Sequence, residues 1–179
     1  MANLNAIYSR RFLEGVERDS RPMAAVLAPW FAAQGMTTAV DYGCGTGVWV
    51  QMMVDAGIDA MGIEGVDAAW DQPACSSARL IHHDLRFPLP AQWLTERVPL
   101  DWTRLDLALS IEVAEHLRPR YARAYLKNLT FGHPAHLVMT AAPPGQGGRW
   151  HVNEQSQAYW SDLLATMDYG LDVPWRDAV

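Results

Sequence analysis

The chain has 179 residues, of which 50% are hydrophobic and 19% charged, the balance of one folded domain rather than of a disordered chain. Its 14 basic and 20 acidic residues give a net charge of −6, which disfavours general electrostatic binding to a nucleic-acid backbone. No apolar run reaches the roughly 18–20 residues that span a bilayer, and the start lacks the apolar segment of a secretory signal, so we expect a cytoplasmic protein.

Short apolar runs alternate with helical stretches, which is typical of a parallel sheet covered by helices. The first helix is expected to begin at the N-cap Ser20, with Pro22 in its first turn, and to end at Gly35. The predicted strands are 37–42, 58–64, 79–83, 105–110 and 136–141. The further predicted helices are 46–56, 66–77, 91–97, 112–129 with a restart at Pro119, and 154–167. The fold class is therefore α/β, a doubly wound, mostly parallel sheet with helices on both faces.

The chain is expected to form a single domain, with an N-terminal helical segment at 1–36 and the main domain at 37–179. Beyond the last predicted helix, only 169–173 has the pattern of a sixth strand. A bare sheet edge exposes backbone groups that can pair with another chain. The edge could be covered by a neighbouring copy in a homo-oligomer, covered by the N-terminal helix, or left open.

The most informative stretch is VDYGCGTG at 40–47, where a predicted strand runs into three alternate glycines and then a helix. Glycine lets the backbone turn sharply and lets a ligand approach closely, and the following helix presents unpaired amide donors. The glycines are Gly43, Gly45 and Gly47, whereas the dinucleotide fingerprint G-x-G-x-x-G would need its third glycine where Val48 stands. A nicotinamide oxidoreductase is therefore disfavoured.

The stretch resembles motif I of the class I S-adenosylmethionine (SAM)-dependent methyltransferases, which reads acid-x-G-x-G-x-G, with Asp41 as the acid. The resemblance extends over about 37–168. It implies a Rossmann-like methyltransferase fold with an abbreviated C-terminus, SAM as the cofactor, and SAM binding by Asp41, Gly43, Gly45 and Gly47.

Two further acids end predicted strands. Glu64 ends the second strand, where a carboxylate can accept hydrogen bonds from both ribose hydroxyls. The resemblance implies that Asp84, at the end of the third strand and next to Leu85, contacts the adenine amino group. It also implies that Ser110, at the end of the fourth strand, faces the methionine part of the cofactor.

An aromatic residue and arginines precede the first predicted helix. In related enzymes such an N-terminal residue closes over the cofactor, which makes Tyr8 and Arg11 candidate cofactor contacts. An arginine would suit the methionine carboxylate through its two-pronged guanidinium. A solvated basic turn is the alternative interpretation.

The resemblance continues in SIEVAEHL at 110–117 and PPGQGGRWHVNE at 143–154. Each stretch contains a histidine, and histidine is the side chain that titrates near neutral pH. One hypothesis makes His151 or His116 the general base that takes a proton from a substrate hydroxyl. The structural alternative is that His116 pins its helix and His151 fixes its loop.

A second chemical hypothesis is a divalent metal site. On a helix Glu112, Glu115 and His116 would share one face, and His151 would arrive at the same sheet edge. This set resembles the small-RNA 3′-end methyltransferases, in which two glutamates and two histidines bind the metal that holds the terminal ribose hydroxyls. We expect no metal ion in the site, and the four-residue metal site is the alternative.

The sequence therefore predicts a SAM-dependent methyltransferase that acts on an oxygen or nitrogen of a small-molecule or sugar-containing acceptor. The negative net charge favours such an acceptor over nucleic acid. Two alternatives stay open: a metal-dependent RNA 3′-terminal 2′-O-methyltransferase, and a SAM-binding accessory subunit without independent activity.

Overall fold

The computed structural model describes residues 8–92, 100 and 102–172, and the statements below refer to those residues. Their strands form one parallel sheet in the order β3-β2-β1-β4-β5. The strands are β1 (Thr38–Tyr42), β2 (Asp59–Glu64), β3 (Leu80–His82), β4 (Leu107–Ser110) and β5 (His136–Met139). The α-helices are α2 (Arg10–Ala33), α3 (Val48–Asp55), α5 (Ala122–Leu129) and α6 (Gln157–Ala165).

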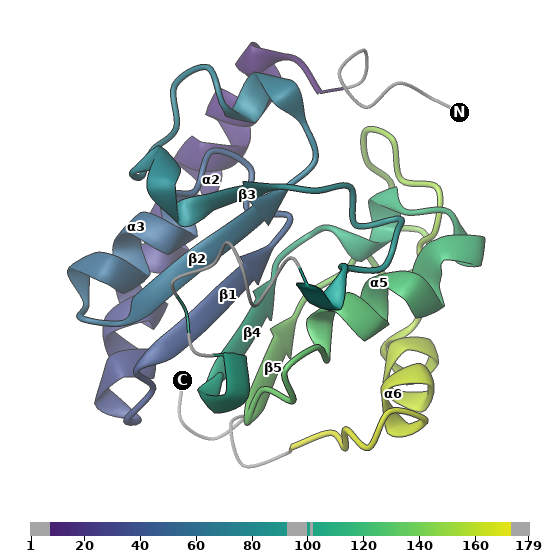
Figure 1. Cartoon of the computed structure of the whole chain (residues 1–179). Coiled ribbons are helices and arrows are strands. Elements are labelled where there is room, and N and C mark those ends of the chain that lie inside the picture. The colour runs from purple at the N-terminus through teal and green to yellow at the C-terminus, as the bar shows by residue number, and fades with distance from the viewer. Residues whose placement is uncertain (1–7, 93–99, 101, 173–179) are drawn as a thin grey trace.

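The sheet is covered on both faces, with α2 and α3 on one side and α5 and α6 on the other (Figure 1). Each face has its own apolar core. Phe31 and Met53 are buried on the α2–α3 side, and Tyr125 and Trp160 on the α5–α6 side. The five predicted strands and the doubly wound α/β fold class are thus confirmed, with strand ends that move by one or two residues.

The predicted start of the first helix is wrong. The helix begins at Arg10, where the Ser9 hydroxyl caps it by accepting a hydrogen bond from the Phe12 amide at 3.4 Å. Ser20 and Pro22 lie in the helix interior. A serine followed by a proline imitates a helix start, but the apolar face continues upstream to the buried Leu13. Packing of that face against the domain outweighs the cost of the two internal prolines, Pro22 and Pro29.

The predicted helix at 66–77 is also wrong, because only short 3₁₀ turns form at Asp67–Ala69 and Ser77–Arg79. Pro73 lies between the two turns and disfavours helical backbone in the residue before it. The predicted helix at 91–97 lies outside the described residues from position 93 onward.

The predicted helix at 112–129 forms an α-helix only in its last eight residues, as α5. Two 3₁₀ turns precede it, at Ala114–His116 and Pro119–Tyr121, so the restart at Pro119 is correct. Glu112 adopts a left-handed backbone with a φ of 56°, which no helix can contain, and its amide donates to the Thr140 hydroxyl at 3.0 Å. The expectation of one helical face for the 112–116 side chains is therefore wrong.

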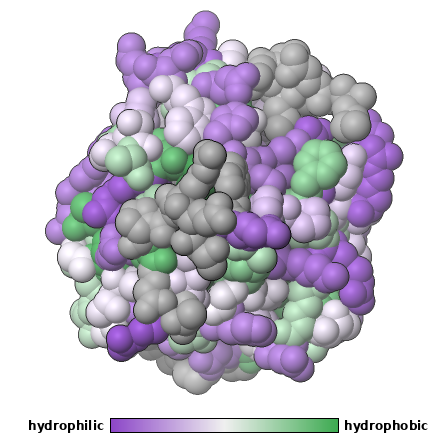
Figure 2. Space-filling model, viewed as in Figure 1, coloured by the Kyte–Doolittle hydropathy of each residue, from purple (hydrophilic) through white to green (hydrophobic). Residues whose placement is uncertain are grey.

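The far edge of the sheet ends at β5. The predicted sixth strand does not form at positions 169–172, and position 173 lies outside the described residues. Among the residues coloured by hydropathy in Figure 2, hydrophilic ones predominate, and hydrophobic ones form small separate areas between them. Within the described ranges, none of the helices has the length and apolar character needed to cross a membrane.

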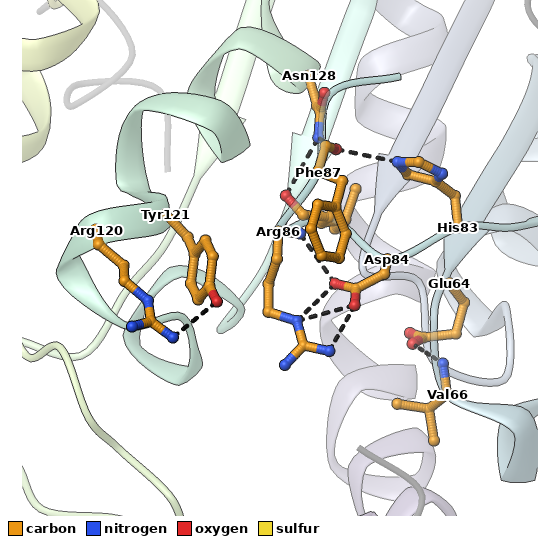
Figure 3. Close-up of polar contacts among 10 residues, drawn as sticks. Glu64, Val66, His83, Asp84, Arg86, Phe87, Arg120, Tyr121 and Asn128 are labelled. Carbon is orange, nitrogen blue, oxygen red and sulfur yellow. Dashed lines mark hydrogen bonds and ion pairs between the residues drawn. The ribbon is translucent and has the colours of Figure 1, made fainter. Parts of the chain in front are cut away.

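One buried side chain ties the loop after β3 to α5. The Asn128 oxygen accepts a hydrogen bond from the Leu89 amide at 2.9 Å, and its nitrogen donates to the carbonyls of Leu85 and Phe87 (Figure 3). Removing one partner of buried hydrogen bonds leaves the other groups unsatisfied. This side chain therefore fixes the loop that carries Asp84.

We predict that Asn128→Ala lowers the free energy of unfolding by about 2–3 kcal/mol, because three backbone groups lose their partner. Lys127→Ala, an exposed change on the same helix, serves as the control and is expected to stay within about 0.5 kcal/mol of the wild type. Urea unfolding followed by circular dichroism measures both. Equal stability of the two variants would contradict the bracing role of Asn128.

Candidate functional site

A crevice of about 460 Å³ opens at the carboxyl ends of the strands, beside the neighbouring strands β1 and β4, where the order of the strands along the sheet reverses. Open α/β sheets bind ligands at this switch point, and ligand pockets have volumes of roughly 300–1,000 Å³. Six segments of the chain supply the lining. They include Tyr8, Phe12, Val16 and Met23 at the N-terminal side, Gly43 and Gly45 after β1, Glu64 at the end of β2, Asp84 and Leu85 after β3, Glu112, Glu115 and His116 after β4, and Arg149 and His151 after β5.

The three glycines after β1 all have left-handed backbone, with φ between 54° and 87°, but they serve different purposes. A Cβ on Gly43 would lie 2.6 Å from a methyl group of Val113, and one on Gly47 would lie 2.6 Å from the Cys75 sulfur. A Cβ on Gly45 would meet no atom within 4 Å. Gly43 and Gly45 line the crevice, whereas Gly47 caps α3 and is required by packing.

Glu64 is buried at the end of β2 and joins two backbone segments. Its two carboxylate oxygens accept hydrogen bonds from the Gly45 amide at 2.9 Å and from the Val66 amide at 2.8 Å. Burial raises the pKa of Glu64, and the backbone hydrogen bonds act in the opposite direction. A carboxylate has about four lone-pair positions, so Glu64 can still accept hydrogen bonds from a ligand.

Asp41 lies deeper than the crevice, against a small cavity of about 30 Å³ behind the glycine loop. Its side chain is buried, and one carboxylate oxygen has no hydrogen-bond partner among the described residues. Burial, assisted by the nearby Glu64 carboxylate, raises the pKa of Asp41 to about 8. The structure therefore places Asp41 beneath the loop rather than in the crevice wall.

Asp84 and Leu85 both line the crevice, as the positions after β3. The Asp84 carboxylate accepts two hydrogen bonds of 2.9 Å from the Arg86 Nε and a third hydrogen bond from the other end of the guanidinium (Figure 3). The Arg86 guanidinium therefore holds the Asp84 side chain in place. Leu85 is buried and contributes an apolar surface.

Of three further residues predicted to contact the cofactor, Ser110 and Arg11 lie away from the crevice and Tyr8 lines it. The Ser110 hydroxyl is fully buried, donating to the Tyr42 carbonyl at 2.7 Å and accepting from the Tyr125 hydroxyl at 2.7 Å. Arg11 is exposed and outside the lining. Tyr8 does line the crevice, with its ring 5.7 Å from that of His116, and burial raises its pKa to about 12.

The structure brings three of the four predicted metal ligands together. Ligand atoms of Glu115, His116 and His151 lie within 4.8 Å of one another, and the two imidazole rings meet edge to face at 5.0 Å. Glu115 is fully buried, and neither of its carboxylate oxygens has a hydrogen-bond partner among the described residues. Glu112 lines the crevice but is not part of this group.

The charges of this cluster depend on burial. Burial raises the pKa of Glu115, and the neighbouring Glu112 carboxylate raises it further. Burial lowers the pKa of His116, as does the nearby His151. A carboxyl group that holds its proton and a neutral imidazole are suited to proton transfer, while the same atoms, once deprotonated, can bind a metal ion.

The wall formed by α2 was missed by the sequence analysis, which placed the helix start at Ser20. Phe12, Val16, Ser20 and Met23 follow one another at three- and four-residue intervals on one face of α2, and all line the crevice. The helical spacing of these residues was the available signal. Arg149 was missed as well, and its guanidinium lies 5.8 Å from the centre of the Phe12 ring.

Comparison with solved structures identifies the fold. A SAM-dependent methyltransferase from Archaeoglobus fulgidus superposes with a TM-score of 0.61 at 17% identity, over 87% of this chain and 68% of that one. The chain has the class I methyltransferase fold. A magnesium protoporphyrin IX methyltransferase from Synechocystis PCC 6803, solved with bound S-adenosylhomocysteine, matches with a TM-score of 0.61 at 16% identity, over 86% and 74% of the two chains.

A third methyltransferase fold, 1,6-didemethyltoxoflavin-N1-methyltransferase from Burkholderia thailandensis, matches with a TM-score of 0.56 at 16% identity, over 91% of this chain and 77% of that one. It was solved with 1,6-didemethyltoxoflavin and S-adenosylhomocysteine bound. No protein-family model matches the sequence, and the search of curated proteins found no match.

The raised pKa of Asp41 makes stability depend on pH. The folded protein keeps a proton there up to a pH of about 8, whereas the unfolded chain releases it near the ordinary pKa of 3.8. The folded state then binds more protons than the unfolded state, so this group lowers stability as the pH rises through that window. The asparagine of Asp41→Asn cannot ionise, so the free energy of unfolding of this variant lacks that pH dependence.

We predict that the free energy of unfolding of Asp41→Asn, relative to the wild type, increases by about 2–4 kcal/mol between pH 5 and pH 8. Urea unfolding at four pH values measures the difference. The control is Asp55→Asn, because Asp55 is an exposed acid that accepts one hydrogen bond from Gln51. A constant difference between Asp41→Asn and the wild type would show that Asp41 is ionised in the folded protein.

Proposed function

We propose that the protein is a SAM-dependent methyltransferase that transfers a methyl group to an oxygen or nitrogen of a small-molecule or sugar-containing acceptor. The observation that carries the proposal is the bare backbone at Gly45, which faces the crevice at the strand switch point, next to the buried carboxylate of Glu64. The methyltransferase fold and the cofactors bound in similar structures support it.

The crevice fits an adenosyl cofactor. The open space at Gly45 would let a ligand approach the backbone closely, and the free lone pairs of Glu64 suit two ribose hydroxyls. We propose that Asp84 and Leu85 contact the adenine base from the next strand, with Asp84 held in position by Arg86. Asp41 and Gly47 would support the loop from behind, and Tyr8 would cover the crevice.

Bound SAM supplies an electrophilic methyl group on a positively charged sulfur. The protein itself has to align the acceptor, exclude water and remove a proton where the acceptor has one to lose. The apolar side chains of Phe12, Val16 and Met23 exclude water from one side of the crevice. His116 and His151 line the same space and can accept the proton.

An acceptor of small size agrees with the crevice volume of about 460 Å³ and with the net charge of −6. Two of the similar structures carry names of small-molecule substrates, magnesium protoporphyrin IX and 1,6-didemethyltoxoflavin. The second of these substrates is methylated on nitrogen, according to the name of its enzyme. These names support a small-molecule acceptor.

We predict that Gly45→Ala weakens SAM binding at least about tenfold, because the added methyl group enters the crevice where the backbone must meet the ligand. Gly57→Ala is a matched control: Gly57 also has a left-handed backbone with no atom near its missing Cβ, but it lies at the far end of α3. Isothermal titration calorimetry with SAM and S-adenosylhomocysteine measures both variants. Absence of SAM binding to the wild-type protein would refute the proposed function.

The grouping of Glu115, His116 and His151 favours a second candidate, a metal-dependent RNA 3′-terminal 2′-O-methyltransferase. Its metal ion would hold the hydroxyls of a terminal ribose in front of the cofactor. Two imidazoles and one carboxylate suit Mn²⁺, Fe²⁺, Co²⁺, Ni²⁺ or Zn²⁺ better than Mg²⁺ or Ca²⁺. The unpartnered oxygens of the buried Glu115 are the observation in its favour.

The second candidate predicts that one Co²⁺ or Mn²⁺ ion binds per chain and that His116→Ala weakens this binding by more than about tenfold. His136→Ala, which changes an exposed histidine at the opposite end of the sheet, should leave it unchanged. Calorimetric titration with each metal salt gives the affinities. Methyl transfer that persists in the presence of a chelator would exclude the metal-dependent candidate.

A further inference from the structure

The loop from 143 to 154 holds the His151 side chain from several directions. The ring lies flat against Gly148, where an added Cβ would come within 2.3 Å of the His151 Nε2 and Cε1 atoms. The amides of the next two residues, Val152 and Asn153, both donate to the backbone carbonyl of Glu115, at 2.9 and 3.0 Å. A histidine that only filled space in a surface loop would not need these restraints.

The backbone before the ring is itself unusual. Trp150 has a left-handed backbone with a φ of 67°, a conformation that costs free energy for a residue with a side chain. Trp150 is also half exposed, so burial of its own side chain does not explain the conformation. The strained turn directs the following residue, His151, into the crevice.

Glu154 determines which ring nitrogen carries the proton. One of its carboxylate oxygens accepts a hydrogen bond from the Gly145 amide at 2.8 Å, and the other lies 3.1 Å from the His151 Nδ1. An ionised carboxylate has no proton to donate, so Nδ1 must be the donor of this hydrogen bond. In a neutral imidazole the lone pair is then on Nε2.

His116 has no such partner. Its Nδ1 is buried without a hydrogen-bond partner among the described residues, and its ring makes a hydrogen bond with the backbone of Trp150 rather than with a carboxylate. Of the two crevice histidines, only His151 is thus held in one tautomer by a carboxylate. This difference distinguishes the two candidate bases, which the sequence could not do.

We propose that Glu154 is a positioning residue that makes His151 the general base, by fixing the proton on Nδ1 and leaving the Nε2 lone pair available in the crevice. The inference rests on the proposed methyl transfer. In that step Nε2 takes the proton of an acceptor O–H or N–H group, whose electron pair forms the bond to the methyl carbon. The carbon–sulfur bond breaks with its electrons left on sulfur, and His151 becomes positively charged while the sulfonium charge is lost.

Nitrogen-15 NMR of the histidine side chains tests the inference without cofactor or acceptor. The full-length protein is labelled on histidine and studied with a chelator present, at a pH where the imidazoles are neutral; the His151 signals are identified by their loss in His151→Gln. The expected wild-type spectrum has a protonated Nδ1 and an unprotonated Nε2 for His151. A wild-type His151 with its proton on Nε2 overturns the inference, independently of the results for the variants.

Glu154→Gln provides the sharper test. With the glutamine oxygen still accepting from the Gly145 amide, its NH₂ group would donate to His151 Nδ1 and force the proton onto Nε2. We expect this reversal in Glu154→Gln and not in Glu14→Gln, an equivalent change at a glutamate that pairs with Arg10 on α2. An unchanged tautomer in a folded Glu154→Gln variant also overturns the inference.

The NMR result and the proposed function can fail separately. Calorimetry with SAM tests cofactor binding in wild type and Glu154→Gln, and equal affinities are expected because Glu154 does not line the crevice. SAM binding together with the wrong tautomer removes Glu154 from the mechanism and leaves the methyltransferase proposal standing. The expected tautomer without SAM binding removes the methyltransferase proposal instead.

Discussion

The carboxylate of Glu64 holds the ends of β1 and β2 in one arrangement, and the crevice is built on that arrangement. Its two oxygens accept from the amides of Gly45 and Val66, so one side chain fixes the glycine loop and the turn after β2 together. Burial of an acid costs free energy, which the backbone hydrogen bonds offset in part, and the pKa of Glu64 stays raised. With the loop held by Glu64, the backbone of Gly45 faces open space.

The parts of the site that sequence analysis predicted are those encoded within a few neighbouring residues. The glycine loop and Glu64 each follow directly from a strand, and parallel strands deliver their ends to one sheet edge. The five strands were predictable for a related reason, because strands buried on both faces form short continuous apolar runs. Local pattern and final structure agree at these positions.

The parts that sequence analysis missed depend on contacts between distant segments. The 112–116 stretch has the spacing of a helix, but the hydrogen bond from Glu112 to Thr140 bends it away. The role of α2 as a wall of the crevice depends on how the whole helix packs on the domain. The sequence did not indicate this, because Ser20 and Pro22 imitate a helix start in the middle of α2. The loop around His151 is held by the Glu115 carbonyl through the amides of Val152 and Asn153, and no short motif encodes a contact between such distant positions.

The helical wall has a thermodynamic consequence. Val16 and Met23 of α2 each keep about two fifths of their surface in contact with solvent beside the crevice. A ligand that fills the crevice covers part of this apolar surface, so some of its binding free energy comes from contact with α2. By linkage, the same ligand opposes local detachment of that helix. Occupancy of the crevice and anchoring of the first helix are therefore two measures of one equilibrium.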